Sequence, residues 1–146
     1  MDKKTLFLLL VSFCVKFVFC AENVWIGGSS GEWNKAENWS LGKVPNAKDD
    51  IAVINATSDT TITLTQNITL GGIKVTGNFV VLIDGDKTIT LSSVSGEVFS
   101  DIGDGATLKM DNMLYGEFGA GMKFVKRGKG LHQQGVGTSK DSTTDS

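Results

Sequence analysis

Cysteine, proline and histidine are scarce in this chain of 146 residues. The two cysteines, Cys14 and Cys20, lie in the first 20 residues, so the rest of the chain cannot form a disulfide and must be held by packing and backbone pairing. His132 is the only histidine and lies in a polar C-terminal stretch, which argues against a Ser-His-Asp triad or a histidine metal site. No window repeats apolar residues at the three- and four-residue spacing of an amphipathic helix.

The first 20 residues have the composition of a secretory signal peptide. Two lysines precede an apolar stretch, Leu6–Phe19, which only Lys16 interrupts, and small residues follow at Cys20 and Ala21. We expect signal cleavage after Cys20 or after Ala21, and a mature chain that is secreted or displayed at the cell surface. The stretch is shorter than the run of about 20 apolar residues that a membrane span needs, so we expect no span in the mature chain. An uncleaved anchor or a core helix is the alternative.

The mature chain has an acidic balance. The leader takes three of the 14 lysines and arginines and one of the 16 acidic residues, which leaves 11 basic against 15 acidic residues. One cluster of basic residues near the C-terminus has few aromatic residues among them, unlike many nucleic-acid-binding patches, and is interpreted as a solvent-exposed edge. Its members are Lys123, Lys126, Arg127 and Lys129. Nucleic acid is therefore not an expected partner.

Short strands separated by turns account for most of the mature chain. Apolar residues alternate with threonine and other polar residues at period two, and Gly, Asn and Asp cluster between the runs. The alternating pairs are Ile62 and Leu64, Ile73 and Val75, Ile89 and Leu91, and Leu108 and Met110. A continuously apolar run at residues 79–83 fits either a strand buried on both faces or a slip in the period. We predict an all-β fold.

A sandwich, a barrel and a solenoid all suit short strands with close turns. Ile73, Ile89 and Leu108 follow one another at similar but unequal intervals, which is compatible with a repeat. Coils of about 20 residues would stack into a solenoid, and the chain has room for about four. We place a cap segment at residues 21–50, solenoid coils at 51–125 and, where apolar residues become few, a disordered tail at 126–146.

The segment WIGGSSGEWNKAENWSLGKVPNAKDDIAVI at residues 25–54 resembles the N-terminal part of autotransporter-associated β-strand repeat proteins. Those chains begin with a tryptophan, a glycine cluster, W-N-x-A-x-N-W-S, V-P and an acidic residue before the first strand. The stretches TITLTQNITLGGIKVTG at 61–77 and FVKRGKG at 124–130 are also similar to patterns of the family. After Gly130 the family's next strand, T-L-x-L-S-G, is not found, so the chain resembles the leading fragment of a passenger.

The resemblance implies a right-handed parallel β-helix, of which this chain holds the first coils and a tryptophan-containing N-terminal cap. It also implies a secreted or cell-surface passenger with a structural or adhesive role, no enzymatic activity and no cofactor. Partners would be extracellular surfaces or glycans. The exposed C-terminal edge of such a stack is a template for further pairing, so self-association through it is expected.

Two other functions follow from particular residues. Trp33 and Trp39, with Asn34 and Asn38, form either a carbohydrate-binding platform or a lid on the first coil, and we favour the lid. A polysaccharide-active β-helix enzyme would need two carboxylates within about 5–10 Å of each other. The available carboxylates are Glu32, Glu37, Glu97, Asp101, Asp104 and Glu117.

Two aspartate-glycine clusters invite a calcium interpretation. They lie at Asp84-Gly85-Asp86 and at Asp101, Asp104 and Gly105. Neither has the D-x-[DN]-x-[DN]-G spacing of a calcium loop, and turns select the same residues. We therefore predict turns and no metal site.

Overall fold

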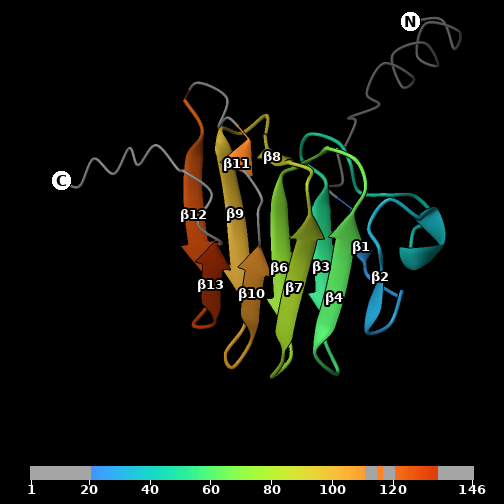
Figure 1. Cartoon of the computed structure of the whole chain (residues 1–146). Helices are drawn as coiled ribbons and strands as arrows, with labels where there is room; N and C mark the ends of the chain where they lie inside the picture. The colour runs from blue at the N-terminus through green and yellow to red at the C-terminus, as the bar shows by residue number, and fades with distance from the viewer. Residues whose placement is uncertain (1–20, 111–114, 117–120, 135–146) are drawn as a thin grey trace, which may run out of the picture.

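A computed structural model describes residues 21–110, 115–116 and 121–134, and in these ranges the chain is all-β with parallel sheets, as predicted for its class (Figure 1). The predicted leader, including Cys20, lies outside the described residues. The strands are β1 (Glu22–Val24), β2 (Ser30–Glu32), β3 (Ile51–Asn55), β4 (Thr60–Leu64), β5 (Ile68–Leu70), β6 (Gly72–Thr76), β7 (Val80–Gly85), β8 (Ile89–Leu91), β9 (Glu97–Ile102), β10 (Thr107–Met110), β11 (Tyr115–Gly116), β12 (Lys123–Arg127) and β13 (Leu131–Gln134). A 3₁₀ turn, η1 (Ala36–Asn38), lies between β2 and β3.

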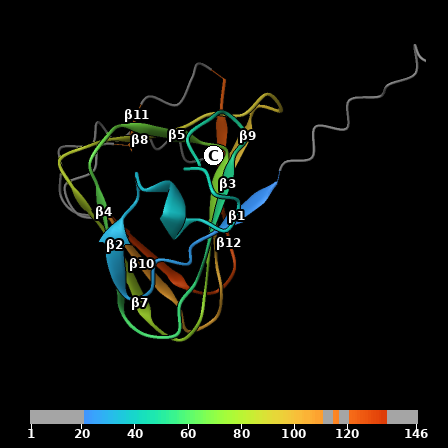
Figure 2. The ribbon, with the colours of Figure 1, turned by 90° about the vertical axis from the view of Figure 1, so that its right-hand side faces the viewer.

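The chain visits three sheets in turn. The first sheet has the order β1-β3-β6-β9-β12, the second β2-β4-β7-β10-β13 and the third β5-β8-β11. Neighbouring strands within each sheet are parallel. The end-on view in Figure 2 shows the sheets as three sides around a common interior. We call one pass through the three sheets a circuit.

The pairing register shows that the circuits differ in length. Ile62 of β4 lies beside Ile83 of β7, and Ile83 lies beside Met110 of β10, so the second of these circuits is the longer one. The intervals noted in the sequence compared side chains on β6, β8 and β10, which belong to three different sheets. The interpretation of those intervals as a repeat was therefore wrong.

The loop at residues 92–96 accounts for the unequal circuits. Only Gly71 separates β5 from β6, whereas this whole loop separates their counterparts β8 and β9 in the next circuit. Asp49, which comes just before β3 and therefore two circuits before β9, holds the loop. Its backbone N–H donates to the Ser92 carbonyl oxygen (3.1 Å), and its Oδ1 accepts from the Val94 N–H (3.0 Å).

Inward side chains from all three sheets form one core. Four residues of predicted strands lie in it and are at most 3% exposed: Ile62, Ile73, Ile89 and Leu108. In β7, Val81 and Ile83 are buried while Leu82 between them is half-buried, so the apolar run keeps period two and buries one face. The alternation read from the sequence is confirmed at β4, β6, β8 and β10, whereas both alternatives expected for residues 79–83 are wrong.

Asparagine side chains at the corners join consecutive circuits. The Oδ1 of Asn34 accepts hydrogen bonds from the backbone N–H groups of Thr65 (2.9 Å) and Gln66 (3.1 Å). The Oδ1 of Asn67 accepts one from Thr88 N–H (2.9 Å). At these corners the backbone N–H groups no longer pair with a neighbouring strand. The asparagine side chains supply the hydrogen-bond acceptors that they need.

Two predicted boundaries need correction. Residues 21–50 contain β1 and β2, which pair with β3 and β4, so the predicted cap segment also supplies strands to the stack. The predicted disordered tail from residue 126 overlaps β12 and contains β13, which pair with β9 and β10. Backbone bonds to an existing parallel edge order these polar residues although their side chains add little apolar burial. Residues 135–146 lie outside the described residues.

His132, placed in the disordered tail by its sequence context, lies in β13 beside Leu108 of β10. Its Nδ1 is 3.1 Å from the Ser100 hydroxyl, and its ring is 6.4 Å from the ring of Phe124 between centroids. Burial lowers the pKa of His132 below its ordinary value, and the charge of Lys126 lowers that pKa further. The folded chain therefore favours the neutral imidazole.

We expect the last circuit to loosen on acidification. The pKa of His132 is lower in the folded state than the unfolded value of 6.5, so its contribution is present above pH 6.5 and is lost as the pH falls through the folded pKa. Hydrogen-exchange protection factors of the β13 amides should stay constant above pH 6.5 and fall as the pH is lowered from 6.5 through the folded pKa. His132→Gln should remove this pH dependence at β13. An equal loss of protection in the Gln variant would assign the effect to another group.

Candidate functional site

Three tryptophans close one end of the core. Trp33 and Trp39 are buried, and their rings lie 4.7 Å apart between centroids at an interplanar angle of 61°. Trp25 meets the Trp39 ring edge to face at 5.3 Å. Figure 2, which faces this end, shows the segment with η1 crossing the opening between the three sheets. The indoles therefore cover apolar side chains that would otherwise meet water.

Each indole N–H is satisfied inside the cluster. Trp39 Nε1 donates to the Trp33 carbonyl oxygen (2.7 Å), and Trp33 Nε1 donates to that of Pro45 (3.2 Å). Trp25 Nε1 donates to the Gly28 carbonyl oxygen (2.8 Å). The rings of Trp33 and Trp39 are thus fixed and enclosed, and neither presents a face on which a sugar could stack.

The two asparagines of the same motif also serve the fold. Asn38 Nδ2 donates to the Glu32 carbonyl oxygen (2.9 Å), while Asn34 Oδ1 holds the corner at Thr65. Gly31 packs against Trp25, because a Cβ there would lie 3.2 Å from the indole. The W-N-x-A-x-N-W motif is thereby accounted for by local packing.

One pair of the carboxylates considered for an enzyme is too widely spaced. Glu97 and Asp101 lie near opposite ends of β9, about 13 Å apart along a strand and beyond the spacing of a glycosidase pair. Glu97 bonds Arg127 (2.5 Å) and Glu32 lies 3.4 Å from Lys35 Nζ. Glu37 is in η1, Asp104 is in the turn after β9, and Glu117 lies outside the described residues.

The aspartate clusters gather no metal-ligand set. Among the described residues, no group of three or more His, Cys, Asp or Glu side chains could hold a metal ion. Asp86 lies 3.0 Å from Lys87 Nζ, and the hydrogen bond and charge of Lys87 lower the pKa of Asp86. In Asp84, Oδ1 is buried and has no hydrogen-bond partner. Gly105 has a φ of 77° in the predicted turn after β9, whereas Asp84 and Gly85 belong to the end of β7, so the turn predicted there begins only after Gly85.

Two side chains of the basic cluster form hydrogen bonds or ion pairs within the last circuits. Lys126 Nζ donates to the carbonyl oxygens of Gly128 (2.7 Å) and Gly130 (2.5 Å). Arg127 pairs with Glu97 and lies 4.5 Å from the Phe99 ring centroid. These contacts fit the solvated edge expected from the sequence.

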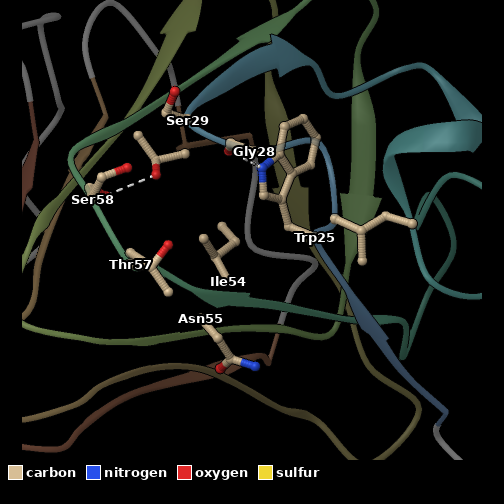
Figure 3. Close-up of a pocket in the computed structure, with 10 residues that line it drawn as sticks. Trp25, Gly28, Ser29, Ile54, Asn55, Thr57 and Ser58 are labelled. Atoms are coloured by element: carbon tan, nitrogen blue, oxygen red, sulfur yellow. Dashed lines mark hydrogen bonds between the residues drawn. The ribbon is translucent and has the colours of Figure 1, made fainter.

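A small cleft lies beside the tryptophan cluster, between the loop after β1 and the segment that joins β3 to β4 (Figure 3). Its volume is about 230 Å³. The lining residues are Trp25, Ile26, Gly28, Ser29, Ile54, Asn55, Ala56, Thr57, Ser58 and Thr60. None of these side chains is titratable near neutral pH, so the cleft offers hydrogen bonds and apolar contact but no acid, base or nucleophile pair.

Sequence reasoning missed this cleft. Ser29 and Ser58 belong to separate polar turns, and each turn alone is unremarkable. The parallel pairing of β1 with β3 and of β2 with β4 brings the two turns together. Glu22 pairs with Ile51, so the first circuit is longer than the coil of about 20 residues expected from the sequence, and that expected offset would not have matched the two turns.

No helix of the described ranges has the length and apolar character of a membrane span. Comparisons of the chain with protein-family models, with curated proteins and with solved structures found no match.

Proposed function

We propose that this chain forms the cap and first coils of a right-handed parallel β-helix, and that it serves as a secreted or cell-surface structural or adhesive protein. The observation that carries the proposal is the pairing of each strand with its counterpart one circuit away in three parallel sheets. A core that runs through successive circuits, closed at one end by tryptophans, is the organisation that a solenoid requires. The resemblance to autotransporter-associated repeat proteins supports the same assignment.

A passive role agrees with the chemistry of the surface. Acidic side chains on the first sheet form ion pairs with other strands of that sheet: Glu97 pairs with Arg127 on the adjacent strand, and Glu22 of β1 reaches across β3 to Lys74 of β6. The outer positions of the second and third sheets carry threonines, among them Thr61, Thr63 and Thr69. Such faces suit contact with extracellular surfaces or glycans and require no cofactor.

We also propose a second copy of the chain as a partner. Strands β12 and β13 are the outermost described strands of their sheets, and an outer strand presents backbone groups to another chain. Lys123 and Lys129 are exposed and would repel their equivalents in a second copy. Association should therefore strengthen as salt screens this repulsion.

Expression of the full chain with a C-terminal epitope tag in a secretion-competent bacterial host tests the proposal. We expect the product in the medium or at the cell surface, with a mature N-terminus at Ala21 or Glu22. Particles coated with the product should adhere to glycan- or matrix-coated surfaces more strongly than particles coated with the heat-unfolded product. Retention in the cytoplasm with Met1 intact would contradict secretion, and equal adhesion of the two preparations would contradict an adhesive role of the folded stack.

A further inference from the structure

We propose that the cleft beside Trp25 binds one neutral sugar ring, the terminal or branch unit of an extracellular glycan. The proposal rests on the proposed extracellular role only for the source of the glycan. The site is distinct from Trp33 and Trp39, whose rings are enclosed. It is built from two loops that the strand register brings together.

The cleft has one apolar side and one hydroxyl side. Figure 3 shows the Trp25 indole opposite Thr57 and Ser58, with Ile54 between them. Ile26 adds a second apolar group at the rim and is 59% exposed. A sugar ring has the matching asymmetry, because its C–H groups prefer apolar surface and its hydroxyls prefer hydrogen-bonding groups.

The polar groups needed for a ligand are uncommitted. Within the described residues, the hydroxyls of Ser29, Thr57 and Ser58 make no hydrogen bond to another side chain or to the backbone. The Asn55 side chain accepts from the Thr76 hydroxyl and points away from Trp25 in Figure 3, so it supplies no group to the ligand. The Thr60 hydroxyl, in contrast, donates to the Ser58 carbonyl oxygen (3.0 Å) and helps to fix the loop.

Size and charge narrow the ligand class. An engineered protein cavity of about 150 Å³ holds a six-membered ring, so about 230 Å³ accommodates such a ring with its hydroxyls. No cation lines the cleft to hold an anionic sugar. Asp59, which lies between Ser58 and Thr60 in sequence, adds a nearby negative charge. The site should therefore prefer neutral sugars to uronates.

Amide chemical shifts of the full chain, measured during titration with neutral methyl glycosides, test the site. We expect saturable shifts at residues 28–29 and 55–60 with dissociation constants on the order of 1 mM, and a weaker response to a methyl uronate. Trp25 should report binding by fluorescence because it is 8% exposed, against 0% for Trp33 and 1% for Trp39. Trp25→Phe should abolish that fluorescence signal.

The double variant Thr57→Val with Ser58→Ala should weaken binding about tenfold, as expected for the loss of two hydrogen bonds. Thr90→Val, on the outward face of the third sheet, is the matched control and should bind as the native chain does. Amide spectra of all variants report whether the fold is kept. Absence of saturable shifts at the cleft, uronate binding as strong as neutral binding, or equal weakening by the control would each overturn the proposal. None of these results bears on secretion or on strand pairing.

Discussion

Replacement of Trp33 by alanine is expected to lower the free energy of unfolding by about 3–5 kcal/mol. Trp33 is fully buried, its ring packs on Trp39, and its N–H bonds the Pro45 carbonyl oxygen. The substitution would leave a cavity at the end of the core and remove the hydrogen bond to Pro45. Because small domains have only about 5–15 kcal/mol of stability, a loss of this size would bring the chain close to unfolding.

Urea unfolding followed by circular dichroism measures this loss. Leu41→Ala is the control, since Leu41 lies in the same segment but is 47% exposed, and it should change stability by less than about 0.5 kcal/mol. Equal effects of the two substitutions would show that the tryptophan cluster is not needed to close the core.

Gly77→Ala is expected to lower the free energy of unfolding by about 3 kcal/mol or more, for two reasons that add. Gly77 has a φ of 101°, where a side chain is strained, and its added Cβ would overlap the Ala56 carbonyl oxygen. Ala56 N–H in turn donates to the Thr76 carbonyl oxygen, so the corner cannot move without breaking a bond between circuits.

Gly28→Ala separates the two causes. Gly28 has a φ of 76°, but no atom lies within 4 Å of the position of its Cβ. Backbone strain alone should therefore cost about 1–2 kcal/mol there. Urea midpoints of the two variants give the difference. If both substitutions cost the same, close contact between circuits at Gly77 makes no contribution.

Strands with regular alternation could be predicted from the sequence, and strands with mixed patterns could not. Ile62 and Leu64 of β4 alternate with threonines, which makes this strand plain in the sequence. Strand β9 was missed because it places Ser100 inside, at 2% exposure, and Phe99 outside over Gly72. A polar residue in the core and an aromatic one on the surface reverse the usual signal. Strands β1 and β2, with three residues each, are too short to show a period.

The tryptophan motif was the part of the candidate site most open to sequence reasoning. Closely spaced tryptophans before the first regular strand predicted a lid on the first coil, and burial of Trp33 and Trp39 agrees with that interpretation. The cleft could not be foreseen, because its two loops become neighbours only through the register of β1 and β2 on β3 and β4. The register of these strands depends on the packing of the whole stack and cannot be inferred from the sequence of either loop.

The loop that enters between β8 and β9 leaves the pairing on both sides of it intact. The architecture therefore tolerates a longer loop at this corner, provided that a side chain such as Asp49 hydrogen-bonds to the inserted residues and holds them against the stack. Peptide epitopes grafted between Ser92 and Gly96 would be displayed outward from a rigid scaffold, and homologous chains could diversify their surfaces by insertion there while keeping the same interior.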